Sequence, residues 1–192
     1  MKGKVAKLPG VNDNTRFLCF DLESNGLHGR AFAAGALIID KNGEVHDEFT
    51  ARVEIEGEVD EWVKDNVLPQ ITDMQITHGS YKAMCDSFWR WFVPAQEKSD
   101  YVLVSNGYPV EYRFLMDCQQ ADPKQRYWEH PFPVIDLSSL LLPLGELKEL
   151  SKSNLLKKIE RRIDVKQHHP LNDAEVTGLM AFEALRFAGR IT

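Results

Sequence analysis

The sequence predicts a mixed α/β fold in which helices flank one sheet. Strand-like apolar runs follow one another early in the chain, whereas later strand-like runs alternate with helical patterns. The 192 residues are 43% hydrophobic and 27% charged, which fits one globular domain with its own core. We therefore expect a single domain over residues 16–192. Residues 1–15, with their lysines, glycines, proline and asparagines, are expected to form a flexible N-terminal arm.

Three strands are expected to open this domain as an antiparallel meander. The apolar run 16–20 suits a buried strand, and a second apolar stretch covers 31–40. The Asn-Gly pair at 42–43 predicts a turn into a return strand over 45–55. The sheet therefore begins with strands that are adjacent in both sequence and space.

Helices and strands are expected to alternate in the rest of the domain. A short helix is expected near 60–66, within a polar stretch. A longer helix starts after Ser80, a plausible N-cap, because apolar residues then recur on one face. The remaining expected elements are strands over 101–105 and 132–135 and helices over 110–119, 136–140, 151–162 and 171–188.

Charge, cysteine content and hydropathy exclude several classes of protein. A formal net charge of −6 argues against a protein that coats long nucleic acid through a broad basic surface. Cys19, Cys85 and Cys118 are isolated, so neither a disulfide framework nor a zinc site is indicated. No apolar run approaches the roughly 20 residues of a membrane span, and no signal-peptide pattern opens the sequence. We expect a cytoplasmic protein, or a nuclear one in a eukaryote, without a membrane partner.

Four acidic residues and one histidine stand where a fold can bring them together. Asp21 and Glu23 follow the first apolar run, and residues i and i+2 of a strand point to the same face. Glu111 and Asp173 each fall in the first turn of an expected helix, where the helix N-terminus helps a carboxylate stay ionised. Such a cluster repels itself unless hard cations neutralise it, and oxygen ligands favour Mg²⁺ or Mn²⁺. His168 adds a candidate base, since an unperturbed imidazole titrates near neutrality.

These segments resemble the motifs of the DnaQ-like exonucleases, the DEDDh group. The first motif of that family, Asp-x-Glu-Thr-x-Gly-Leu, is similar to Asp21-Leu22-Glu23-Ser24-Asn25-Gly26-Leu27. The third, a histidine followed by four residues and an aspartate, resembles His168-His169-Pro170-Leu171-Asn172-Asp173. The middle motif matches Glu111-Tyr112-Arg113-Phe114-Leu115, except that glutamate replaces aspartate. The resemblance runs from about Arg16 to Ala188.

The resemblance implies a ribonuclease H-like fold, with a five-stranded mixed sheet made of an antiparallel meander and then parallel strands. It implies a 3′–5′ exonuclease that releases nucleoside 5′-monophosphates from the 3′ end of single-stranded DNA or RNA. Two divalent cations, Mg²⁺ or Mn²⁺, would be held by Asp21, Glu23, Glu111 and Asp173, with His168 as general base. Relatives are often homodimers, so a homodimer is a further expectation.

The resemblance also implies residues that hold the substrate. Gly26 and Leu27 would lie under the terminal nucleotide, with Leu27 against the base and Ser24 near the sugar. His28 is a candidate substrate contact or, alternatively, a surface loop residue. The basic helix expected over 151–162 would either guide phosphates or form a solvated face.

Alternatives remain open at several of these positions. Glu111 either ligates metal after a backbone adjustment or has lost that role, with Asn106 then a degenerate equivalent of a metal aspartate. His169 competes with His168 as base, and the spacing to Asp173 favours His168. A helix N-cap explains Asp136. Five aromatic residues are expected in the core: Trp62, Phe88, Trp89, Trp91 and Phe92.

Two other function classes fit the same pattern. One is a non-catalytic module that keeps the fold and binds a nucleic-acid end or a protein. The other is an oxygen-ligated metal hydrolase that acts on a small phosphate ester. The sequence does not distinguish DNA from RNA, because that choice depends on contacts to the 2′-hydroxyl group.

Overall fold

The computed structural model describes residues 10–129, 131, 133–142, 152–161 and 163–191. Residues 1–9 of the expected arm lie outside this part, as do residues 132, 151 and 162 of the expected strand and helix. The described residues of the arm form a turn, in which the Asn12 N–H donates to the hydroxyl of Thr15 at 2.9 Å. Thr15 is buried, so the chain is already packed against the domain where the first strand begins.

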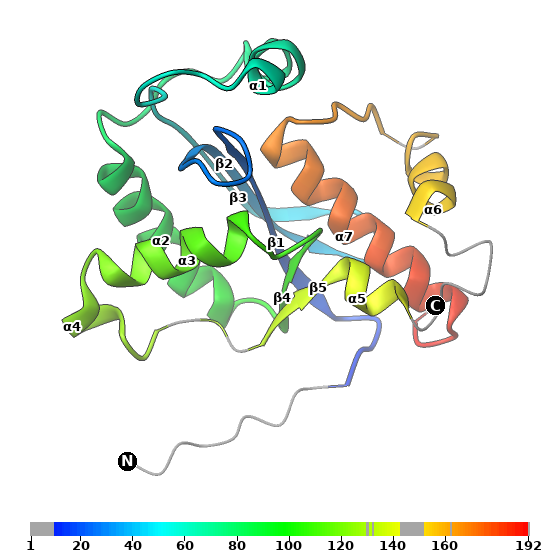
Figure 1. The fold of residues 1–192 in the computed structure, drawn as a ribbon. Coiled ribbons are helices and arrows are strands. Elements are labelled where there is room, and N and C mark those ends of the chain that lie inside the picture. Colours follow the sequence, from blue (N-terminus) through cyan, green and yellow to red (C-terminus); the bar gives the residue numbers. More distant parts are fainter. Residues whose placement is uncertain (1–9, 130, 132, 143–151, 162, 192) are drawn as a thin grey trace.

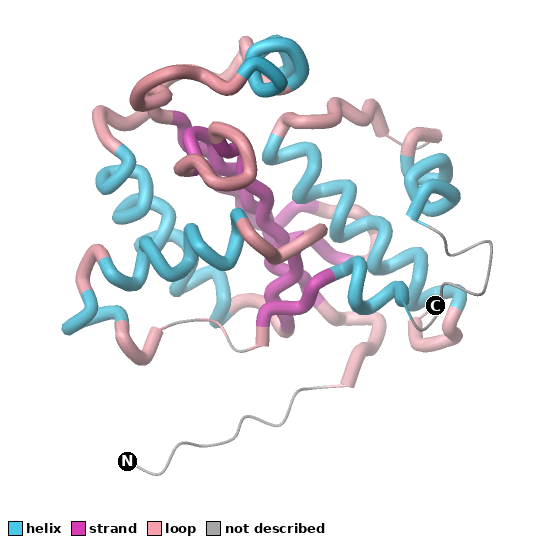
Figure 2. The backbone as a smooth tube through the Cα atoms, viewed as in Figure 1, coloured by secondary structure: helices cyan, strands magenta, loops and turns pink. Residues whose placement is uncertain are grey.

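The strands form one mixed five-stranded sheet in the order β3-β2-β1-β4-β5 (Figures 1 and 2). β1 (Arg16–Ser24), β2 (Ala31–Asp40) and β3 (Val45–Arg52) are the antiparallel meander. β4 (Tyr101–Val104) pairs parallel with β1, and β5 (Val134–Asp136) pairs parallel with β4. The predicted sheet of antiparallel and then parallel strands is therefore confirmed.

The ends of β1 and β3 differ most from the expected ones, while β4 ends one residue earlier and β5 one residue later than expected. β1 continues through Asp21 and Glu23 to Ser24, because β2 pairs with it along this whole length. β3 ends at Arg52, short of the expected residue 55, since Arg52 pairs with Ala33 and the partner strand soon ends. The acidic residues of the first motif consequently belong to a paired strand.

Helices cover both faces of the sheet (Figure 1). α2 (Tyr81–Glu97) and α3 (Val110–Gln120) lie on one face. α5 (Leu137–Leu141), α6 (Lys152–Ile159) and α7 (Pro170–Phe187) lie on the other. None of the helices in the described part is long and apolar enough to span a membrane. The shorter elements are α1 (Glu61–Asn66), the 3-10 helix η1 (Leu68–Ile71) and α4 (Pro123–Arg126).

Two predicted helix N-caps are confirmed. The Ser80 hydroxyl accepts a hydrogen bond from the Ala83 N–H at 3.2 Å at the start of α2. Asp136 Oδ1 accepts one from the Ser139 N–H at 2.9 Å at the start of α5. Each side chain satisfies a backbone donor that the first helical turn leaves without a partner.

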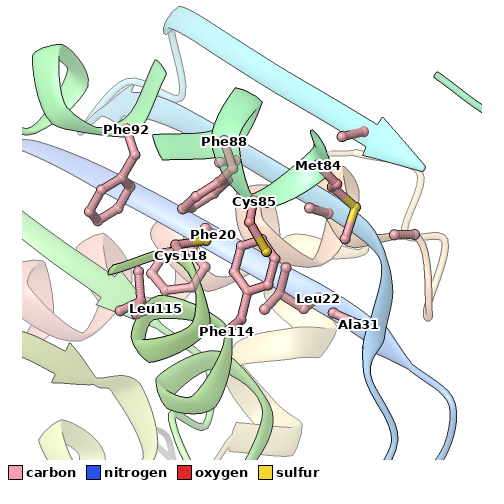
Figure 3. Packing of buried hydrophobic residues seen from close by; sticks show 14 of the residues in the cluster. Phe20, Leu22, Ala31, Met84, Cys85, Phe88, Phe92, Phe114, Leu115 and Cys118 are labelled. Atoms are coloured by element: carbon pink, nitrogen blue, oxygen red, sulfur yellow. The ribbon is translucent and has the colours of Figure 1, made fainter. Parts of the chain in front are cut away.

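An aromatic core fills the face under α2 and α3 (Figure 3). The ring of Phe20 on β1 lies 5.7 Å from that of Phe88 and 5.9 Å from that of Phe92, both on α2. Phe88 in turn meets Phe114 of α3 edge to face at 5.0 Å. The expectation that Phe88 and Phe92 belong to the core is confirmed, and α3 is anchored through Phe114.

The opposite face of β1 carries the acidic residues toward α7. Cys19 packs in the cluster under α7, and strand alternation places Asp21 and Glu23 on that same face. Gly35 of β2 is paired with Asp21, and a Cβ at residue 35 would lie only 2.1 Å from the amide nitrogen of Leu171. The start of α7 therefore lies directly against the sheet, beside the acidic end of β1.

Candidate active site

One cavity of about 860 Å³ receives all five residues that the sequence predicts as catalytic. Asp21 and Glu23 reach it from β1, Glu111 from the first turn of α3, and His168 and Asp173 from the start of α7. These segments are far apart in sequence, and the fold brings them to one end of the sheet. The cavity is the candidate active site.

Glu23, His168 and Asp173 form its tightest group. Each offers a ligand atom, and these atoms all lie within 4.8 Å of one another. The Nδ1 atom of His168 is 3.9 Å from Oε1 of Glu23. Glu23 is only 8% exposed, and burial, followed by the negative charges of Asp173 and Glu111, raises its pKa to about 8.

Local backbone geometry orients His168. Its φ of +62° lies in the left-handed region, which histidine adopts more readily than most side chains. Its N–H donates to Oδ2 of Asp173 at 2.8 Å, at the point where Pro170 begins α7. The imidazole ring then lies 5.2 Å from the Trp62 ring, edge to face. The same hydrogen bond therefore fixes both the loop and the carboxylate of Asp173.

His169 is held outside the cavity. Its Nε2 atom lies 3.6 Å from Oδ1 of Asp73, and Asp73 also accepts a hydrogen bond from the Lys166 ammonium group at 2.9 Å. His169 is not among the residues that line the cavity, whereas His168 is. The geometry therefore favours His168 over His169 as the base, as does the spacing.

The α3 side of the cavity presents Glu111. This side chain is 7% exposed, and burial raises its pKa to about 7, with a further contribution from the charge of Asp136. Each carboxylate oxygen of Asp136 already accepts a backbone N–H: Oδ1 caps α5, and Oδ2 accepts the Gly107 N–H at 2.7 Å. Asn106 also lines the cavity, and its Oδ1 atom accepts the Ser138 hydroxyl at 2.6 Å. Glu111 is thus the carboxylate that this side offers.

The loop between β1 and β2, which contains Leu27, forms one wall of the cavity. Ser24, Gly26 and Leu27 line the cavity, and the Ser24 hydroxyl donates to the Gly26 carbonyl at 2.8 Å. Gly26 has a φ of +70°, and Leu27 is 67% exposed. His28 is exposed and is not among the lining residues, so the structure does not bring this candidate substrate contact to the site.

Trp62 corrects the expectation that it belongs to the core. It is 56% exposed and lines the cavity, because α1 buries its neighbour Val63 and leaves Trp62 at the surface. Tyr108 is a second aromatic residue of the lining that sequence reasoning missed, and it is 82% exposed. A large aromatic residue in a polar stretch, two residues after the N-cap Asp60, was the available signal for Trp62.

The basic helix α6 borders the cavity. Leu156 contributes to the lining, while Leu155 and Ile159 are buried in the cluster with α7. Lys157 and Lys158 are exposed and lie outside the lining. These two lysine side chains therefore lie on a helix that borders the cavity, outside the cavity lining.

The donor set fits hard divalent cations. Glu23 and Glu111 are buried carboxyl groups with raised pKa values, and the described side chains that line the cavity include no lysine or arginine. A bound cation would compensate the charge that burial disfavours, and carboxylate oxygens are the ligands that Mg²⁺ and Mn²⁺ take. Asp21, Glu23, Glu111 and Asp173 are the residues that would hold such ions.

Comparisons with solved structures show which proteins share this fold. No family model and no curated protein sequence matches the chain. The nuclease domain of 3′hExo, a DEDDh family member bound to rAMP, superposes with a TM-score of 0.62 at 14% identity, covering 95% of this chain and 98% of that one. Exonuclease X, in complex with 5′ overhanging duplex DNA, gives a TM-score of 0.55 at 15% identity, covering 91% and 93%.

A zinc-bound complex of E. coli exonuclease I with single-stranded DNA gives a TM-score of 0.65 at 16% identity. It matches 92% of this chain, which spans only 41% of that longer protein. These superpositions cover 91–95% of this chain, so they include its five-stranded mixed sheet and the helices that flank it. The structural neighbours are therefore exonucleases of the kind that the motifs resemble, and the chain has their ribonuclease H-like fold.

Proposed function

We propose that this chain is a metal-dependent 3′–5′ exonuclease that releases nucleoside 5′-monophosphates from the 3′ end of single-stranded DNA or RNA. The observation that carries the proposal is the meeting of Asp21, Glu23, Glu111, His168 and Asp173 in one cavity, in a chain with an exonuclease fold. Neighbours bound to rAMP and to DNA support nucleic acid as the ligand.

The four carboxylates would hold two divalent cations. When bound, such ions stabilise the charge on the attacking and leaving oxygens of an in-line phosphodiester displacement. The chain fixes its ligands before substrate arrives: strand alternation orients Asp21 and Glu23, and the His168 N–H orients Asp173. Little reorganisation is then needed at the moment of reaction.

His168 is the proposed general base. Its imidazole borders the cavity and its side chain is 37% exposed, so a proton taken from the attacking water can pass to solvent. In the proposed step the water oxygen bonds to phosphorus, and the bond from phosphorus to the 3′ oxygen of the preceding nucleotide breaks. That oxygen leaves with a proton from solvent.

The cavity has apolar surfaces suited to a nucleobase. Leu27 and Trp62, from the β1–β2 loop and from α1, both line it and are both more than half exposed. Apolar and aromatic side chains stack on any base, because every base has a π-face. We therefore expect hydrolysis that tolerates most terminal bases.

The test is hydrolysis of a 3′-labelled single-stranded oligonucleotide with Mg²⁺ or Mn²⁺. The expected result is metal-dependent release of labelled mononucleotide, which Asp21→Ala abolishes and Asp65→Ala, a change of an exposed aspartate on α1, does not. Activity on a mononucleotide ester but on no oligomer would instead identify a small phosphate ester hydrolase. No metal-dependent release, with Asp21→Ala indistinguishable from the wild type, would contradict the enzyme proposal.

A second candidate is a non-catalytic binding module on the same fold. The observation that favours it is the position of Glu111, which lies outside the close group formed by Glu23, His168 and Asp173. Such a module would bind a single-stranded 3′ end and leave it intact at every metal concentration. Binding and hydrolysis assays on the same oligonucleotide separate the two candidates.

A further inference from the structure

The geometry points to Arg113 as a positioning residue for the terminal nucleotide. Arg113 lies on α3, and its guanidinium reaches the β1–β2 loop. Nη2 donates to the Leu27 carbonyl at 2.8 Å, and Nη1 donates to the His28 carbonyl at 3.0 Å. This inference rests on the proposed function and deepens it, because it names what holds the wall against which the terminal base would stack.

The Arg113 guanidinium donates to two consecutive carbonyl groups. A guanidinium is planar and its two terminal nitrogens point in fixed directions, so a double contact sets the orientation of two successive peptide groups, Leu27–His28 and His28–Gly29. The other hydrogen bonds at the tip of this loop act one residue earlier, where the Gly26 carbonyl accepts the Ser24 hydroxyl at 2.8 Å and the Gly29 N–H at 3.2 Å, and the Leu27 side chain is 67% exposed. The direction of the Leu27 side chain therefore depends on Arg113.

A second tether holds the same loop from the other side. Oδ1 of Asn25 accepts the Asp60 N–H at 2.8 Å, and its Nδ2 donates to the Glu58 carbonyl at 2.8 Å. Asp60 caps α1, the helix that carries Trp62. The loop is thus tied to α1 through Asn25 and to α3 through Arg113.

The two tethers set the spacing of the proposed base site. Leu27 belongs to the tethered loop, and Trp62 belongs to the helix that this loop contacts. Release of Arg113 frees the Leu27 wall without touching Glu23, His168 or Asp173. We therefore expect its loss to weaken nucleotide binding while the metal ligands and the base stay in place.

The first experiment compares steady-state kinetics of Arg113→Ala and Arg113→Lys with the wild type on a 3′-labelled oligonucleotide. Arg113→Ala should raise KM about ten-fold with kcat within about three-fold, the pattern of lost binding rather than lost chemistry. Arg113→Lys can reach one carbonyl and should recover part of the loss. Arg90→Ala, an exposed arginine of α2, is the control for removing one positive charge. Melting curves and Mn²⁺ affinity should be the same for all variants.

A double-mutant cycle with Leu27→Ala separates positioning from direct contact. If Arg113 acts through Leu27, then Arg113→Ala adds little to KM once the Leu27 side chain is gone. If Arg113 instead touches a phosphate, the two changes multiply, and the dependence of KM on salt becomes less steep in Arg113→Ala. Multiplying effects would overturn the inference, as would an unchanged KM in Arg113→Ala.

Binding of a nucleoside 5′-monophosphate, measured by calorimetry with Mn²⁺, distinguishes failure of this inference from failure of the proposed function. A wild-type chain that binds the mononucleotide but hydrolyses no oligonucleotide contradicts only the enzyme proposal. The inference then stands if Arg113→Ala binds about ten-fold more weakly and fails if it binds equally well. A chain that binds no mononucleotide and hydrolyses no oligonucleotide overturns both.

Discussion

The two sides of the cavity are built differently. On the β1–α7 side, ligand atoms of Glu23, His168 and Asp173 lie within 4.8 Å of one another. The backbone of β1 and of the turn before α7 sets the direction in which these side chains point. On the α3 side stands Glu111, buried beside Asp136 and outside that group. Both sides come from segments that resemble exonuclease motifs, but among the four expected metal ligands only Glu111, on the α3 side, departs from its motif, with glutamate in place of aspartate.

The comparison shows that local backbone structure sets the positions of the ligand atoms on the β1–α7 side, whereas the length of the side chain at position 111 sets the position of the carboxylate on the α3 side. Strand alternation and the Asp173–His168 hydrogen bond assemble the β1–α7 side whatever occupies position 111. The α3 helix is held by the core through Phe114, so its backbone cannot move far to suit a longer side chain. We infer that the β1–α7 side supplies a partial metal site and that Glu111 determines how well it works.

Glu23→Gln is the substitution with the largest expected effect. Glutamine keeps the shape of the side chain but removes a charged ligand, so activity should fall roughly 10³-fold or more, as several kcal/mol of transition-state charge stabilisation depend on the bound ions. The metal-free protein should also become more stable at neutral and higher pH, because folding no longer requires residue 23 to take up a proton or to bury its charge. Rate and melting temperature measure the two effects. Glu97→Gln, an exposed change on α2, is the control, and activity within ten-fold of the wild type would contradict the assignment.

His168→Ala tests the other half of the β1–α7 side. Loss of a general base should lower kcat by about 10²- to 10³-fold. The cavity is open at this position, so added imidazole should restore part of the rate to His168→Ala and none to Glu23→Gln. His78→Ala, a histidine far from the motif and bonded to Thr77, is the matched control. A rate that imidazole does not change would leave the base role without support.

Glu111→Gln and Glu111→Asp probe the α3 side. If Glu111 is a working ligand in a site that the other side partly forms, then removing its charge should cost about 10- to 100-fold in activity, less than the change at Glu23. Glu111→Asp should fall between the wild type and Glu111→Gln, because it keeps the charge but shortens the reach. Rates across a Mn²⁺ titration show whether the loss is one of metal affinity.

Asn106→Ala decides between Glu111 and its alternative. Asn106 lines the same cavity, but its amide oxygen is already occupied by the Ser138 hydroxyl. The expected activity is within about three-fold of the wild type, the small effect of a group outside the reacting set. A larger loss in Asn106→Ala than in Glu111→Gln would transfer the ligand role to Asn106 and make Glu111 incidental.

Sequence reasoning was most successful where a short-range rule determines the geometry. The facing of Asp21 and Glu23 follows from strand alternation, and the N-caps at Ser80 and Asp136 follow from side-chain chemistry. The sheet order agrees with the motif resemblance. The end of β3 was misplaced because pairing stops when the partner strand stops, which the sequence of β3 does not reveal.

The sequence did not predict the role of a side chain where that role depends on which face of a short helix packs against the rest of the domain. Trp62 looked like a core residue, since large aromatic side chains are usually buried, but the short helix α1 buries only Val63. Arg113 sat within a recognised motif, yet its bonds to two carbonyls more than eighty positions earlier depend on the folded loop. Tertiary contacts of this kind have no local signal.

The smallest expected effect is on the pH dependence of stability in chelator. Glu23 and Glu111 have folded-state pKa values raised to about 8 and about 7, from an ordinary value of 4.5. The folded protein therefore binds more protons than the unfolded chain between these limits, and stability falls as pH rises from about 5 to about 8. The melting temperature should drop by several degrees over this range, and saturating Mg²⁺ should remove most of the drop. Glu23→Gln should flatten the profile more than Glu111→Gln, because its pKa is raised further. Equal flattening by both variants would show that the two sides of the cavity bury their charge alike, and an unchanged slope in either variant would mean that its carboxylate is already ionised at pH 5.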